Sequence, residues 1–144
     1  MNLNVLVAEP CNEDWTSIAK GLRRRLPEAS VLRVKDGEQA LRFTFQPALL
    51  TPDAQIPHLV LLSAELPVVS ADNVLAQLRQ DPRTWCISVL VLSKDSATVK
   101  IEAFRAGEWL FEIESAVALE VQVAEAVRRL CSGGLGQRPA VACP

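Results

Sequence analysis

Five short apolar stretches, each followed by a segment of helical character, constrain the fold of this chain more than any other feature. The central one, Leu59–Leu62, is a continuous apolar run, which predicts a strand buried on both faces of a parallel sheet. Strict alternation of strands and helices is typical of α/β folds with right-handed crossovers. We expect strands at Asn4–Ala8, Val31–Val34, Leu59–Leu62, Ile87–Leu92 and Trp109–Ile113.

The segments between these runs carry apolar residues at helical spacing. We expect helices at Trp15–Leu26, Asp36–Phe43 and Ser70–Gln80, another from Lys94 to Gly107, and a last one at Ala116–Leu130. Asn12 or Asp14 is the expected cap of the first helix, and Asp36 that of the second. Residues 1–131 are expected to form one domain, and residues 132–144 a flexible tail rich in glycine and proline.

This order of elements predicts a doubly wound parallel sheet of flavodoxin type, with strand order 2-1-3-4-5. In such sheets the ligand crevice lies at the carboxyl ends of the strands, between the first and third strands. The residues expected there are Glu9, Pro10, Ser63 and Glu65, with Ser93 nearby at the end of the fourth strand. The question of function therefore centres on a serine at the end of the central strand.

Composition excludes several classes of protein. The net charge of −2 argues against non-specific nucleic-acid binding, which needs a basic surface. No stretch has the roughly 18 uninterrupted apolar residues of a membrane-spanning helix, and the N-terminus lacks the features of a signal peptide. We therefore expect a cytoplasmic protein.

The four cysteines, Cys11, Cys86, Cys131 and Cys143, match no zinc-binding spacing. In a cytoplasmic protein they are expected to be reduced thiols, with Cys86 and Cys131 as small buried residues. The single histidine, His58, begins the central strand, so it is not expected to face Ser63 as a hydrolase base would.

Several segments together resemble the receiver domains of response regulators, the CheY-like family. They include Val5–Glu9, Lys35–Leu41, Pro57–Pro67, Leu78–Thr84, Ile87–Ser93 and Ala106-Gly107. The resemblance covers nearly the whole chain. The long loop at 46–57 and the Asp81–Thr84 segment are also similar to single-domain regulators that serve bacterial phytochromes.

This resemblance implies a phosphorylation site that the sequence has largely lost. Receivers carry two acids after the first strand, an acceptor aspartate after the third, a hydroxyl after the fourth and a lysine after the fifth. Here those positions hold Glu9 and Pro10, Ser63, Ser93 and Glu114. Phe111 falls at the position of the aromatic switch residue.

These departures predict a degenerate pseudo-receiver. A serine is a poor nucleophile without a base, and its phosphate ester would lack the lability of an acyl phosphate. Because Pro10 stands where receivers carry a second acid, the Mg²⁺ site is expected to be lost, which leaves Glu9 and Glu65 as weak metal candidates. Phosphorylation of Ser63 by a serine/threonine kinase stays an alternative, as does a working phosphoacceptor regulator with an atypical site, or an enzyme of flavodoxin-like fold with a bound cofactor.

The expected role is a non-enzymatic module of a two-component phosphorelay system that acts through protein contacts, since no effector domain is evident. The resemblance implies a sensor histidine kinase or a phytochrome-like protein as partner. The last expected helix is apolar around much of its circumference, which favours a second burial surface. The resemblance places a homodimer interface on the 94–107 helix, the fifth strand and that last helix.

Overall fold

A computed structural model describes residues 3–93, 108–112 and 117–132 of the chain. The elements, in chain order, are β1 (Asn4–Ala8), α1 (Asn12–Arg25), β2 (Ser30–Val34), α2 (Gly37–Phe45), the short 3-10 helix η1 (Pro47–Leu49), β3 (Leu59–Ser63), α3 (Ala71–Gln80), β4 (Ser88–Ser93), β5 (Glu108–Glu112) and α4 (Leu119–Ser132). The helix expected between Lys94 and Gly107 lies outside the described residues, so α4 is the helix predicted at Ala116–Leu130. From residue 133 on, the expected tail lies outside them as well.

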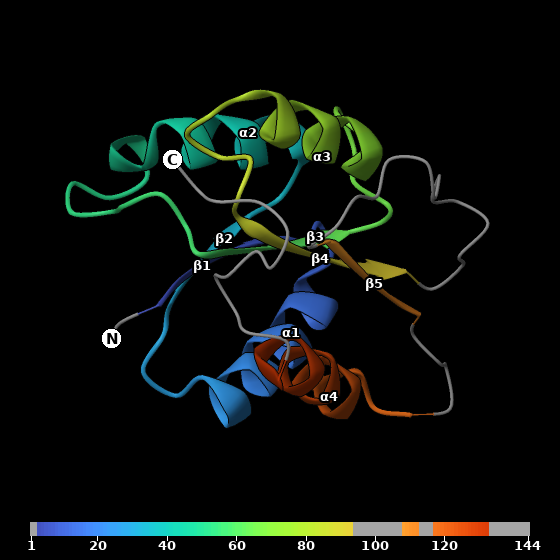
Figure 1. The fold of residues 1–144 in the computed structure, drawn as a ribbon. Helices are drawn as coiled ribbons and strands as arrows, with labels where there is room; N and C mark the ends of the chain where they lie inside the picture. Colours follow the sequence, from blue (N-terminus) through green and yellow to red (C-terminus); the bar gives the residue numbers. More distant parts are fainter. Residues whose placement is uncertain (1–2, 94–107, 113–116, 133–144) are drawn as a thin grey trace.

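The predicted sheet is confirmed. Its five strands are all parallel and follow the order β2-β1-β3-β4-β5. Figure 1 shows α2 and α3 on one face of the sheet and α1 and α4 on the other. The order in which strands are added to the sheet reverses at β1, with β2 on one side of it and β3 on the other, which creates the switch point where α/β folds bind ligands.

Alternate residues of the strands supply two separate cores, because side chains of a strand point to opposite faces in turn. On β3, Val60 and Leu62 pack in the core under α2 and α3, whereas Leu59 and Leu61 pack in the core over α1 and α4. All four are completely buried. The continuous apolar run of the sequence thus reflects a strand that is covered on both sides.

The helix starts are partly as predicted. Asp36 caps α2, since its carboxylate accepts a hydrogen bond of 2.7 Å from the amide of Gln39. Ser70 caps α3 in the same way, through the amide of Asn73. The expected cap of α1 is wrong: Cys11 holds the cap position and its side chain makes no capping bond. The acids Glu13 and Asp14 instead lie in the first turn, where their negative charge interacts favourably with the helix dipole.

The expectation of reduced cysteines is wrong for Cys86, which is disulfide-bonded, while Cys11 is a free and exposed thiol. Spacing along the chain does not reveal such a bond, because it depends on how closely the fold brings two Cβ atoms together. None of the helices in the described part of the chain is long and apolar enough to cross a membrane.

Candidate functional site

Ser63 ends β3 at the centre of the sheet, in register with Leu92 of β4. The next amide, that of Ala64, donates to the carbonyl of Leu92 at 2.9 Å and carries the chain off the sheet. The Ser63 hydroxyl oxygen then accepts a hydrogen bond of 3.3 Å from the amide of Glu65. The serine therefore stabilises its own turn, as hydroxyl residues commonly do two positions before an amide.

Glu9 follows β1 directly and is only 6% exposed. Its carboxylate accepts a hydrogen bond of 3.2 Å from the Cys11 amide, which closes a tight turn around Pro10. Its backbone is held as well, because its amide donates to the Val34 carbonyl at 3.0 Å. The acid is thus built into the β1–α1 connection.

Arg33 of β2 holds the Glu9 backbone, a contact that the sequence did not suggest. Its Nε and Nη2 atoms donate to the Glu9 carbonyl oxygen at 3.1 and 2.9 Å. The same guanidinium lies over the Trp15 ring, 5.7 Å from its centre, which is cation–π range. No sequence signal could have identified this contact, since it depends on the pairing of β1 with β2.

A cavity of about 160 Å³ opens at this edge of the sheet. Four of the predicted residues line it together, namely Glu9, Pro10, Ser63 and Glu65. Cys11 and Asp14, which the sequence did not indicate, also line it, from the start of α1. Helical periodicity could have suggested Asp14, because it lies one turn before the buried Ile18, another lining residue.

The other predicted positions lie further from this cavity or outside the described residues. Ser93 is completely buried at the end of β4 and is not among the lining residues, although Leu92 beside it is. Phe111 belongs to β5, in register with Leu92. Glu114 lies outside the described residues. His58 is at the opposite end of β3 from Ser63, where its Nδ1 accepts a hydrogen bond from the Asn4 amide.

Two of the described residues around the cavity bear on the expected loss of a Mg²⁺ site. Pro10 has no side-chain oxygen, and one oxygen of Glu9 is engaged by the Cys11 amide. No group of three His, Cys, Asp or Glu side chains is placed to hold a metal among residues 3–93, 108–112 and 117–132. The described lining also contains no lysine or arginine, so Glu9, Asp14 and Glu65 make it acidic.

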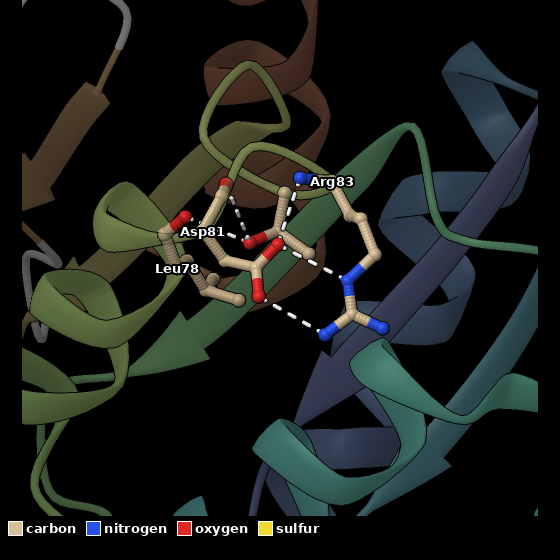
Figure 2. Close-up of polar contacts among 4 residues, drawn as sticks. Leu78, Asp81 and Arg83 are labelled. Atoms are coloured by element: carbon tan, nitrogen blue, oxygen red, sulfur yellow. Dashed lines mark hydrogen bonds and ion pairs between the residues drawn. The ribbon is translucent and has the colours of Figure 1, made fainter.

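The Asp81–Thr84 segment, in contrast, is structural and joins α3 to β4. Figure 2 shows Arg83 forked onto the Asp81 carboxylate, with Nε–Oδ1 and Nη2–Oδ2 distances of 3.1 and 3.0 Å. The hydrogen bonds from the Arg83 side chain hold the pKa of Asp81 below its usual value. Thr84 is buried, and its hydroxyl donates to the Leu78 carbonyl at 2.7 Å. Arg83 also lies 5.2 Å from the centre of the Phe45 ring, which ties this loop to α2.

No protein-family model matches the sequence, and no curated protein matches it either. Solved structures do. The response regulator RPA3017 in red light signaling of R. palustris is 27% identical, with a TM-score of 0.69 over 99% of this chain and 98% of that one. The phosphorylated cyanobacterial phytochrome response regulator RcpA is 21% identical, with a TM-score of 0.76 over 97% of this chain and 100% of that one.

The Mn²⁺-bound form of the response regulator Rcp1 is a further match, at 20% identity and a TM-score of 0.67, with 99% of both chains covered. These similarities extend over nearly the full length of each chain and agree with the sheet order observed here. This chain therefore has the fold of the receiver domains of response regulators.

Proposed function

We propose that this chain is a signalling module of a two-component system that does not use the aspartyl-phosphate chemistry of receiver domains. The observation that carries this proposal is the state of Ser63. It occupies the end of β3, where the family resemblance expects the acceptor aspartate, and its oxygen serves as the acceptor of a local turn. The module would instead signal by binding other proteins.

The surroundings of Ser63 support this reading. A serine attacks phosphorus only when a base removes its proton, and the product would be a stable ester. Phosphoryl transfer also needs cations to neutralise the charge that develops on the transferred group. Pro10 offers no side-chain metal ligand, and the described lining of the cavity offers no cation. We accordingly propose that the module needs no metal cofactor and has no enzymatic activity.

A phosphorylation assay tests the proposal. The protein is incubated with acetyl phosphate and Mg²⁺, and its intact mass is measured at neutral pH and after hydroxylamine, which cleaves acyl phosphates. We expect no phosphoryl adduct on the wild-type chain. Stoichiometric adduct that hydroxylamine removes would instead support a working regulator with an atypical site.

The variant Ser63→Asp sharpens this assay. We expect it to remain poorly phosphorylated, because Pro10 still supplies no metal ligand. The double variant Ser63→Asp with Pro10→Asp is the matched comparison, because it supplies both the acceptor carboxylate and the second acid beside Glu9. Robust labelling of the single variant would show that Pro10 matters less than we propose.

For the partner, we propose a sensor histidine kinase of the phytochrome kind, because the R. palustris protein named above acts in red light signaling. We propose a cytoplasmic location for this encounter. Purified phytochrome kinase and this chain, mixed and run over a sizing column in both light states, provide the test. Co-elution in one light state supports the pairing, and separate elution in both states contradicts it.

We further propose a homodimer that uses the α4 side of the fold. Val117, just before α4, and Val121, in its first turn, are 40% and 46% exposed and would be covered by a second copy. Sedimentation at tens of micromolar is expected to show a dimer that Val121→Glu weakens. Leu49→Glu, at an apolar residue of η1 that is 59% exposed, is the control and is expected to leave the dimer intact. A monomeric wild-type chain would remove this proposal.

A further inference from the structure

The loop between β3 and α3 contains a residue in a strained backbone conformation. Val68 has a φ of 71°, and it is the only non-glycine residue with positive φ in the part of the chain that the structure describes. A β-branched side chain is rarely found there, because its Cβ collides with the backbone. The Val69 amide donates to the Pro67 carbonyl at 2.9 Å, which closes a three-residue γ-turn around Val68. The form of this turn with positive φ is the rare, strained one.

Burial of Val68 does not compensate for this strain, because its side chain is 73% exposed. The turn is held from the α2 side instead. The Gly37 amide donates to the same Pro67 carbonyl at 3.2 Å. Gly37 also lies so close to the loop that a Cβ on it would stand 1.9 Å from the Val69 carbonyl oxygen. The first residue of α2 therefore clamps the strained turn.

The same loop forms the rim of the Ser63 cavity. The Ser63 hydroxyl oxygen holds the Glu65 amide, and only Leu66 separates Glu65 from the clamped Pro67. Leu66 is 9% exposed and belongs to the core beneath α2 and α3. Because this buried side chain joins the two turns, we expect a shift of the Ser63 turn to displace Leu66 and so disturb Pro67.

We propose that the turn at Pro67–Val69 is a conformational latch that couples the Ser63 cavity to the start of α2. In the closed state Gly37 holds Pro67 and Val68 stays strained. In the open state Val68 relaxes to a negative φ, and the Pro67 carbonyl leaves the Gly37 amide. Stored strain of this kind persists only where surrounding contacts enforce it, and it is common in switch regions. The proposal goes beyond the role suggested above, since it makes α2 a surface whose state depends on the cavity.

Amide hydrogen exchange of the full chain, measured residue by residue by NMR, tests the strained turn. Val68→Gly removes the Cβ collision, so the Gly37 and Val69 amides are expected to exchange several-fold to roughly tenfold more slowly than in the wild type. Val68→Pro forces φ to a negative value, so those amides are expected to exchange faster. Ile56→Gly is the matched control, because it truncates an exposed β-branched residue without positive φ and is expected to leave both amides unchanged. Unchanged or faster exchange in Val68→Gly would overturn the latch.

Coupling to the cavity is tested by Ser63→Ala, which removes the acceptor of the Glu65 amide. The latch predicts faster exchange at Glu65 and also, by several-fold, at Gly37, which Ser63 does not contact. In the double variant the slowing by Val68→Gly is expected to offset the acceleration by Ser63→Ala at Gly37, because both substitutions act on the same opening. If Ser63→Ala changes Glu65 alone, the coupling is refuted. A failure of this test leaves the phosphorylation assay unaffected.

Discussion

Replacement of Gly37 by alanine is the sharpest single test of how this fold is packed. An ideal Cβ on Gly37 would lie 1.9 Å from the Val69 carbonyl oxygen, 2.8 Å from the Val69 carbonyl carbon and 2.9 Å from the Val69 Cβ. The obstacle is mainly backbone, so no rotation of a side chain can relieve it. The β3–α3 loop must move by about 1 Å or more, and the hydrogen bond from the Gly37 amide to Pro67 is lost.

The magnitude follows from three opposing contributions. Overpacking costs about 1–3 kcal/mol, and the lost hydrogen bond about 1 kcal/mol. The higher helix propensity of alanine offsets up to about 1 kcal/mol. We expect Gly37→Ala to lower the free energy of unfolding by about 2 kcal/mol, which for a chain of this size lowers Tm by about 4–8 °C.

Urea unfolding followed by tryptophan fluorescence measures this difference. Glu38→Ala is the matched control, because Glu38 is the next residue of α2 and its ion pair with Arg42 is exposed. That variant is expected to stay within about 0.5 kcal/mol of the wild type. If Gly37→Ala is as stable as the control, the close approach of α2 to the loop does not exist in solution and the reasoning fails.

Three further predictions concern the rest of the fold. Gly21→Ala would place a Cβ 2.6 Å from the Glu120 carbonyl oxygen where α1 crosses α4, so we expect a loss of about 1–3 kcal/mol by chemical denaturation; a gain would mean that the helices separate freely. Thr84→Val removes the donor to the Leu78 carbonyl and should lower the free energy of unfolding by about 1–2 kcal/mol. Thr84→Ser keeps the hydroxyl and should retain most of that stability; equal stability of all three chains would contradict this. Hydrogen bonds from two arginines lower the pKa of Glu125 to about 2, so its small stabilising effect is present above pH 4.5 and is lost as the pH falls towards 2. Glu125→Gln should flatten that part of the pH–stability curve at low salt, and an unchanged curve would show that the ion pairs contribute nothing.

The sequence by itself determined the architecture, because strand and helix patterns are local. Burial of Leu59–Leu62 on both faces left a continuous apolar run, and the alternation of such runs with helical segments specified the parallel sheet and its order. It also predicted which residues meet, since the carboxyl ends of neighbouring parallel strands share one edge. Glu9, Pro10, Ser63 and Glu65 accordingly line one cavity.

Tertiary structure alone decided how those residues are engaged. The fork of Arg33 onto the Glu9 carbonyl and the approach of Gly37 to Val69 join residues that are distant in sequence. So does the disulfide bond of Cys86, for which spacing carried no signal. Such contacts depend on the positions of whole elements to within an ångström, and periodicity along the chain carries no information at that scale. The strain at Val68 belongs to the same class, because no residue preference would place a valine at positive φ unless packing from α2 enforced it.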